Sequence, residues 1–136
     1  MKLKIFTDGG SRGNPGEAAV GVVIFDFEDG KKLKEISKCI GRATNNIAEY
    51  SAVLEALKWV KKNKGRCDLE FILDSELVVR QLMGIYKVKD LNLKAIYLEI
   101  QDLIVEIGGG CNFTAVKREH NLEADTLVNI ALDKKC

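Results

Sequence analysis

The sequence has little of several features that mark specialised classes of protein. One proline among 136 residues, with 46% hydrophobic and 30% charged residues, excludes a disordered chain, a collagen-like repeat and a low-complexity segment. No apolar run approaches the roughly 20 residues that cross a bilayer, and the first residues lack the apolar stretch of a signal peptide. We therefore expect a soluble, cytoplasmic protein with no membrane partner.

Histidine, paired cysteines and excess charge are also scarce. A single histidine, His120, and four cysteines without a C-x-x-C pair are too few for an ordinary zinc site. We expect the thiols to be reduced and buried or inert, with a Cys67–Cys136 bridge as the minor alternative. Twenty-one Lys and Arg residues balance twenty Asp and Glu residues. This balance excludes a histone-like binder but leaves room for a local basic strip.

Apolar periodicity and turn signals divide the chain into elements that fit one domain over residues 1–136. The predicted strands are 2–7, 18–27, 31–40, 69–73 and 111–116, and the predicted helices are 44–60, 75–82, 91–107 and 121–132. Gly21, inside the second strand, marks a place where a neighbour approaches closely. The element order predicts an α/β fold, in which helices flank a five-stranded mixed sheet with its first three strands antiparallel.

Four acidic residues stand where burial is expected. Asp8 and Asp74 end apolar strands, on the side of an α/β sheet where sites are usually built. Glu49 and Asp125 lie on apolar stripes in the first turns of their helices, where the helix dipole favours an anion. Taken singly, each acid is better explained as a cap or an ion-pair partner. Taken together, they favour a site for a hard cation such as Mg²⁺, because clustered buried carboxylates would otherwise repel one another strongly.

The glycine-rich segment GGSRGNPG at 9–16 is predicted to be a turn whose backbone lies close to another group. It matches neither the P-loop nor the dinucleotide-binding motif. A simple tight turn is the commoner explanation of such a stretch. Its position directly after Asp8 also favours a sugar-phosphate backbone that passes over it.

Four motifs, in order along the chain, resemble those of the type 1 ribonuclease H family. They are TDGGSRGNPG at 7–16, TNNIAE at 44–49, DS at 74–75 and NLEAD at 121–125. The resemblance covers essentially the whole chain, and the family's mixed sheet agrees with the element order above. It implies an endonuclease that hydrolyses the RNA strand of RNA–DNA hybrids and leaves 5′-phosphate and 3′-hydroxyl ends. Activity on double-stranded RNA stays open.

By position, the resemblance implies catalytic and metal-binding roles for Asp8, Glu49, Asp74 and Asp125. Two Mg²⁺ or Mn²⁺ ions are implied with substrate. In the family's arrangement Asp8 bridges both ions, Asp125 helps to hold the ion beside the nucleophile, and Glu49 and Asp74 lie beside the leaving group. The implied partner is an RNA–DNA hybrid, and we expect a monomer without an obligatory protein partner.

The resemblance also implies which residues contact the two strands. They are Gly9, Gly10, Ser11, Ser75 and Glu76, with Glu49, for the 2′-hydroxyls of RNA, and Asn14, Thr44, Asn45 and Asn46 for the DNA strand. Helix capping explains the TNN segment equally well. We expect one of its three residues to cap the helix and the others to contact substrate.

The sequence departs from the family pattern in three places, and the first departure indicates the compact branch that lacks the basic handle. The handle is reduced to the short segment 84–91. Substrate binding is therefore expected to be weaker or to use the lysines at 58, 61, 62 and 64. The favoured interpretation of these lysines is an ordinary solvated helix end. The histidine loop is cut to KREH at 117–120. His120 could still shuttle protons, because an imidazole titrates near neutrality. We expect it instead to cap a helix, with Arg118 or Glu119 partly replacing its function. Glu76 stands where glutamine is frequent and adds negative charge.

Two other functions stay open on the same fold. One is a junction-resolving nuclease, against which Asn14, Thr44 and Asn45 argue, because these positions suit hybrid geometry. The other is a non-catalytic module that binds nucleic acid. The four intact carboxylates argue against it, since without a metal they would only repel phosphate.

Overall fold

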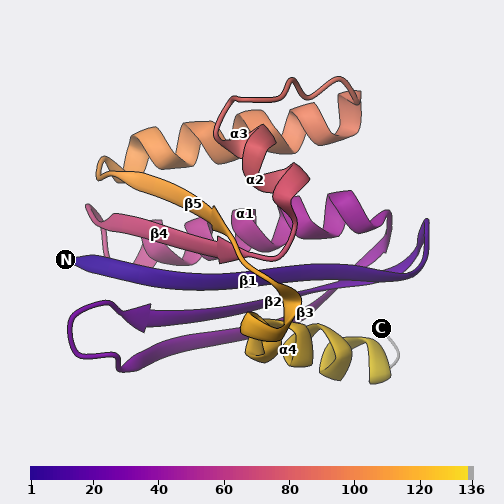
Figure 1. Cartoon of the computed structure of the whole chain (residues 1–136), viewed down its shortest axis with the longest axis horizontal. Coiled ribbons are helices and arrows are strands. Elements are labelled where there is room, and N and C mark those ends of the chain that lie inside the picture. Colours follow the sequence, from indigo (N-terminus) through magenta and orange to yellow (C-terminus); the bar gives the residue numbers. More distant parts are fainter. Residues whose placement is uncertain (135–136) are drawn as a thin grey trace.

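The computed structural model describes residues 1–134, which form a five-stranded sheet with helices on both faces (Figure 1). The strands are β1 (Lys2–Gly13), β2 (Gly16–Asp26), β3 (Lys32–Ala43), β4 (Asp68–Leu73) and β5 (Cys111–Ala115). Their order in the sheet is β3-β2-β1-β4-β5. The pairs β1–β2 and β2–β3 are antiparallel, whereas β1–β4 and β4–β5 are parallel. The predicted fold class is confirmed.

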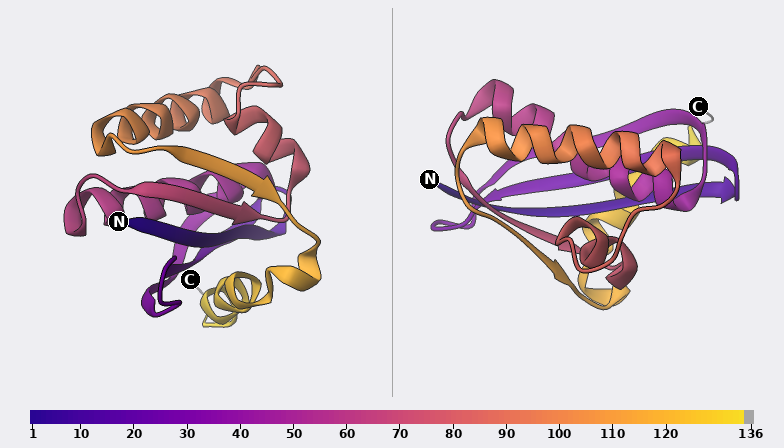
Figure 2. Two further views of the ribbon diagram at one scale, coloured as in Figure 1. Left: turned by 60° about the vertical axis from the view of Figure 1, so that its left-hand side comes forward. Right: turned by 90° about the horizontal axis from the view of Figure 1, so that it is seen from above.

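The helices lie on opposite faces of this sheet (Figure 2). They are α1 (Asn45–Asn63), α2 (Glu76–Leu82), α3 (Leu91–Ile107) and α4 (Leu122–Asp133), and a 3₁₀ turn, η1 (Arg118–His120), precedes α4. Helix α1 packs on β1 and β2 and is itself covered by α3, while α4 packs on β1, β2 and β3 from the other side. None of the helices in residues 1–134 combines the length and apolar composition that crossing a membrane requires.

The main core lies between the sheet and α1. The stripe Ala52, Val53, Ala56 and Val60 of α1 is buried, as its helical spacing predicted. Strand β2 is buried on both faces because α1 covers one and α4 the other, which explains its almost uninterrupted apolar sequence. Burial of this kind is the main favourable contribution to folding.

The glycine-rich segment differs from its prediction. Residues 9–13 continue β1 in regular pairing with β2, and only Asn14 and Pro15 form the turn. The close approach was predicted correctly, because a Cβ atom on Gly9 would lie 2.2 Å from the carbonyl carbon of Ala48 in α1. Glycine is therefore needed where α1 crosses the strand at backbone contact, while the antiparallel partner supplies the hydrogen bonds of a regular strand.

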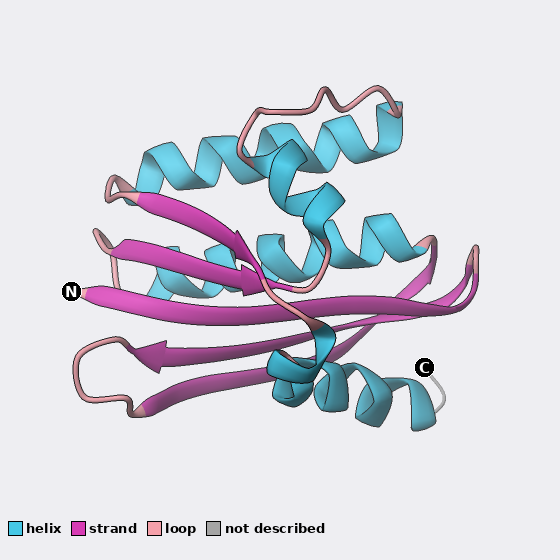
Figure 3. Cartoon of the chain, in the orientation of Figure 1, coloured by secondary structure: helices cyan, strands magenta, loops and turns pink. Residues whose placement is uncertain are grey.

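The loops and helix ends agree broadly with the sequence pattern. Thr44 is the N-cap of α1, and its Oγ1 accepts a hydrogen bond from the backbone N–H of Ile47 at 3.2 Å. This identifies the capping member of the TNN segment. The connection between α2 and α3 is short and lacks secondary structure, which leaves no basic handle there (Figure 3).

Two of the cysteines are free thiols in this structure. They are Cys67 and Cys111, and burial raises the pKa of both, that of Cys111 to about 12. The minor alternative of a Cys67–Cys136 bridge is therefore wrong for Cys67, and Cys136 itself lies outside the described residues. A buried thiol with a raised pKa is protonated and unreactive, as expected for these two cysteines. Cys39 is disulfide-bonded, so the expectation of reduced thiols is wrong for it.

Candidate active site

The four predicted carboxylates line one open cavity of about 540 Å³. Asp8 comes from β1, Glu49 from α1, Asp74 from the loop after β4 and Asp125 from α4. Carboxylate oxygens of Asp8, Glu49 and Asp74 lie within 4.8 Å of one another, and the nearby Asp125 raises the pKa of Asp8. Asp8 is thus the member that interacts with all three other carboxylates.

Asp8 occupies a different place in its strand from the one predicted. It lies inside β1, which continues to Gly13, and not at the end of the strand. The parallel pairing of β1 with β4 stops at Phe6 and Ile72. Asp8 therefore lies just beyond the paired part of β4, where Asp74 follows the strand. The two acids meet because a neighbouring strand ends, as at the edge of other α/β sheets.

Two glycines let the helices approach the sheet. At Gly9, an added Cβ would lie 2.5 Å from the backbone nitrogen of Glu49. At Gly21, it would lie 2.1 Å from the carbonyl oxygen of Ala124, next to Asp125. The close approach expected at Gly21 is confirmed. The helices that carry Glu49 and Asp125 therefore lie nearer the sheet than any side chain at these positions would permit.

Burial and repulsion raise the pKa of the clustered carboxyl groups. The pKa of Asp8 rises from 3.8 to about 8, first through burial and then through the charges of Asp74 and Asp125. That of Glu49 rises from 4.5 to about 7 through burial and the charge of Asp74, although a hydrogen bond from Ser75 opposes the rise. Burial also raises the pKa of Asp74. A divalent cation would stabilise the ionised form of all of them.

In chelator, the protein should lose stability as the pH rises. The native pKa values of Asp8 and Glu49, about 8 and about 7, lie above their ordinary values of 3.8 and 4.5, so the native state holds more protons than the unfolded state. The stability is present at low pH and is lost as the pH passes through the native values. We expect Tm in EDTA to fall from about pH 5 to about pH 8, and Mg²⁺ to restore it. A flat or rising Tm in EDTA would contradict the electrostatic description.

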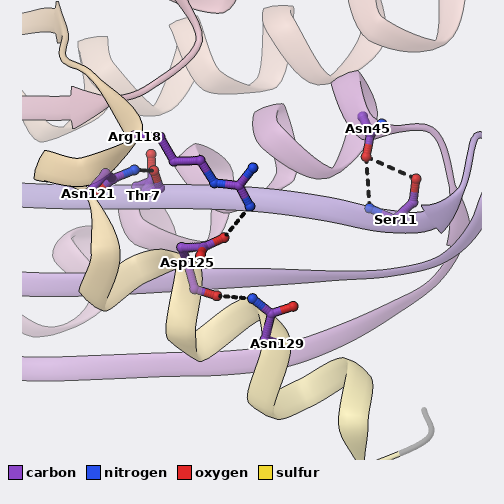
Figure 4. Close-up of polar contacts among 7 residues, drawn as sticks. All are labelled: Thr7, Ser11, Asn45, Arg118, Asn121, Asp125 and Asn129. Atoms are coloured by element: carbon purple, nitrogen blue, oxygen red, sulfur yellow. Dashed lines mark hydrogen bonds and ion pairs between the residues drawn. The ribbon is translucent and has the colours of Figure 1, made fainter.

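Arg118, predicted as an auxiliary residue, lies in the same cavity. Its Nη2 donates a hydrogen bond to Oδ1 of Asp125 at 3.1 Å (Figure 4). Its positive charge also lowers the pKa of Asp74, which partly offsets the rise caused by burial. A cation beside two of the four carboxylates is well placed to contact a phosphate in the cavity.

The prediction that His120 caps a helix is wrong. His120 ends the turn η1, its imidazole is exposed 3.6 Å from Glu119, and it lines a separate cavity of about 280 Å³ with Phe6 and Phe25. The N-cap position of α4 belongs to Asn121. The 3₁₀ turn separates the histidine from the helix, and no local sequence signal announces such a turn.

The predicted substrate-binding residues divide between two cavities that share Asn45 and Asn46. The residues beside the carboxylates are Gly9, Gly10, Ser11, Asn45, Asn46 and Ser75. The residues of the second cavity, of about 430 Å³, include Asn14, Thr44, Asn45 and Asn46. Glu76 is not among the described residues that line either cavity. Its Oε1 accepts a hydrogen bond from Arg80 at 2.7 Å.

Hydrogen bonds around Asn45 connect the two cavities. Its Oδ1 accepts from the backbone nitrogen of Ser11 at 2.9 Å and from the Ser11 hydroxyl at 3.1 Å (Figure 4). Its own backbone N–H donates to Oδ1 of Asn14 at 3.1 Å. The turn after β1 and the start of α1 are therefore held together between the cavities.

Sequence reasoning missed several residues that line the carboxylate cavity, namely Arg12, Val128, Asn129 and Leu132. Asn129 donates a hydrogen bond to the backbone oxygen of Asp125 at 3.1 Å (Figure 4). Positions 129 and 132 follow Asp125 at helical spacing, and this signal could have identified them.

The lysines at the end of α1 lie on a different surface from the carboxylates. Lys58 and Lys61 form ion pairs with Glu99 at 3.8 Å and Glu106 at 2.5 Å, both on α3. Lys61 stands twelve residues after Glu49, about 18 Å along the helix. Lysines 58, 61, 62 and 64 all lie outside the carboxylate cavity that the described residues form. The solvated helix end is the interpretation that this geometry favours.

Comparison with solved structures gives close matches over nearly the whole chain. LC11-RNase H1, isolated from compost, is 46% identical with a TM-score of 0.91, covering 98% of this chain and 96% of that one. RNase H1 from the halophilic archaeon Halobacterium salinarum is 39% identical with a TM-score of 0.92, covering 98% and 99%. LC11-RNase H1 has also been solved in complex with an RNA/DNA hybrid, and that structure is 44% identical with a TM-score of 0.91, covering 98% of each chain.

Sequence comparison agrees. The family model described as "Reverse transcriptase-like" matches residues 6–131. The bifunctional protein Rv2228c of Mycobacterium tuberculosis is 41% identical over 133 residues, which are 98% of this chain but only 36% of that protein. Ribonuclease HI of Halobacterium salinarum is 40% identical over 132 residues, 97% of this chain and 65% of that protein. The chain therefore belongs to the type 1 ribonuclease H family, in its compact form.

Proposed function

We propose that the protein is an endoribonuclease that hydrolyses the RNA strand of RNA–DNA hybrids and leaves 5′-phosphate and 3′-hydroxyl ends. The observation that carries this proposal is the meeting of Asp8, Glu49, Asp74 and Asp125 in one open cavity with three of them at ligand spacing. The relative solved with an RNA/DNA hybrid supports the choice of substrate.

The four carboxylates would hold two divalent cations. A donor set made only of carboxylates, without histidine or cysteine, fits Mg²⁺ or Mn²⁺. When bound, such ions stabilise charge on the phosphate and lower the pKa of an attacking water. Asp8 interacts with all three other carboxylates, so it would help to hold the cations together with each of them.

Polar residues around the carboxylates would bind and orient the two strands. Ser11 lies beside the carboxylates together with Ser75, and Ser75 also lowers the pKa of Glu49, which favours its ionised form. We assign the RNA strand to this cavity. The DNA strand is assigned to the second cavity, where Asn14 and Asn46 offer short polar groups suited to a phosphate.

A cleavage assay tests the function directly. Labelled RNA–DNA hybrid, double-stranded RNA, double-stranded DNA and a four-way DNA junction are incubated with Mg²⁺, Mn²⁺ or EDTA. We expect cleavage of the RNA strand of the hybrid only when metal is present. Hybrid cleavage that is undiminished in EDTA would overturn the metal-dependent mechanism. Tight binding of hybrid without cleavage at any metal concentration would favour a non-catalytic module, and cleavage of four-way junctions a resolving nuclease.

Replacing His120 should matter less than replacing Arg118. His120 is exposed and lines another cavity, so His120→Ala should keep a substantial fraction of activity. Arg118→Ala removes a charge-assisted hydrogen bond to Asp125 and should lower kcat about tenfold or more. Steady-state kinetics on the hybrid measure both values. A thousandfold fall for His120→Ala would show that the histidine, despite its exposure, takes part in the reaction.

A further inference from the structure

Asn121 is a buried polar residue with an unusual set of contacts. Its side chain is 1% exposed, and although it stands at the N-cap position of α4 it makes no capping hydrogen bond. Its Nδ2 instead donates to the backbone oxygen of Thr7 at 2.9 Å (Figure 4). Its Oδ1 has no hydrogen-bond partner within residues 1–134. A buried carboxamide that leaves one atom unpaired and the helix uncapped is costly, which indicates a role outside its own helix.

Each contact of Asn121 leads to a different carboxylate. Thr7 directly precedes Asp8, so the amide holds the part of β1 from which Asp8 projects. The Asn121 side chain also lies near Asp74 and lowers the pKa of that carboxyl. The helical bond from the N–H of Asp125 to the backbone oxygen of Asn121, at 3.2 Å, then places the first turn of α4 relative to the point that the amide holds. One residue therefore connects β1, the end of β4 and the first turn of α4.

These contacts oppose a repulsion that the site otherwise suffers. Asp8, Asp74 and Asp125 come from three elements and border an open cavity, into which they could relax apart. Each of the three Asn121 contacts ties one of these elements to a single buried point. A ligand set that is already at its spacing can bind a cation without first rearranging.

We propose that Asn121 is a positioning residue that holds Asp8, Asp74 and Asp125 in place around the cavity before any cation binds. This inference rests on the proposed function only through the binding of metal by these carboxylates. A polar residue is needed at this buried position because of the contacts of its amide, and not because it caps α4.

Calorimetric titration of the protein with Mn²⁺, without substrate, tests the proposal. Asn121→Ala removes the amide, and Asn121→Leu keeps the branched shape but cannot donate to Thr7. We expect both variants to bind Mn²⁺ about 10- to 100-fold more weakly than the wild type. In hybrid cleavage we expect kcat to fall by a similar factor at limiting metal and to recover in part at high metal, with KM for the hybrid changed by no more than about threefold.

A matched control separates positioning from plain stability. Ile107→Ala leaves a cavity in the core at the end of α3, away from the carboxylates. The side chain of Ile107 is 4% exposed. The substitution should lower Tm but keep wild-type affinity for Mn²⁺. If the Asn121 variants lower Tm and yet bind Mn²⁺ like the wild type, the residue is merely structural and the proposal is overturned.

The same titration keeps the two proposals distinguishable. If the wild type binds Mn²⁺ but cleaves no hybrid, the proposed function fails, while the comparison of affinities still decides the role of Asn121. If Asn121→Ala does not fold, Asn121→Leu, which better fills the vacated volume, carries the comparison. Wild-type Mn²⁺ affinity in Asn121→Leu would by itself overturn the assignment to the amide.

Discussion

Asp8→Asn should abolish hydrolysis of the hybrid while the fold is retained. Asp8 interacts with all three other carboxylates, so its replacement removes the central ligand of the proposed metal site. We expect kcat to fall about a thousandfold or more, because the metal centre supplies several kcal/mol of transition-state stabilisation. Burial and neighbouring charges raise the pKa of Asp8 to about 8, so removing its charge should also raise Tm in EDTA. Hybrid cleavage and thermal unfolding measure the two effects.

Asp26→Asn is the matched control for this prediction. Asp26 ends β2 at the opposite end of the sheet, where its Oδ1 accepts a hydrogen bond from the N–H of Glu28 at 2.9 Å. Asparagine can accept the same bond, so both activity and stability should stay near those of the wild type. If Asp8→Asn retained activity within about tenfold of the wild type, the four-carboxylate site would not be the catalytic centre.

Gly9→Ala should destabilise the protein and reduce its activity together. The new methyl group would lie 2.2 Å from the backbone oxygen of Ala48, and backbone cannot move aside by changing a rotamer. Either β1 or the first turn of α1 must shift, and that turn carries Glu49. We expect a loss of about 3 kcal/mol in the free energy of unfolding, at the upper end of the usual cost of overpacking. Urea unfolding and hybrid cleavage give the two readings.

The neighbouring glycine provides the control for stability. At Gly10 the nearest atom to an added Cβ is Cγ1 of Val128 at 3.6 Å, an ordinary contact. Gly10→Ala should therefore change the free energy of unfolding by less than about 1 kcal/mol. Equal stability of Gly9→Ala and Gly10→Ala would show that α1 does not cross β1 at backbone contact.

Much of the fold and of the carboxylate cluster follows from local pattern. The alternation of strands and helices is sufficient for the mixed sheet, because parallel neighbours require long crossovers. Glu49 and Asp125 could be identified because each interrupts an apolar helical stripe. An acid at such a position has to meet a partner or a cation, whatever the rest of the chain does.

The remaining features depend on contacts that local sequence does not encode. Residues 9–13 read as a turn because glycine is rare in strands, and only the packing of α1 explains their conformation. His120 was predicted to be a cap because it precedes a helix. It instead ends η1, and Asn121 takes the N-cap position of α4. Asn121 resembled a capping residue by type, and its role in the site follows only from its approach to Thr7 across the sheet.

The position of α4 at the end of the element order has a consequence for biosynthesis. Asp125 is delivered by this last helix, which also covers the face of β1, β2 and β3 opposite α1. A nascent chain whose α4 segment is still inside the ribosome can pair its strands, but it exposes an apolar sheet face and carries an incomplete set of carboxylates. The proposed metal centre is therefore complete only once this helix has emerged and docked on the sheet.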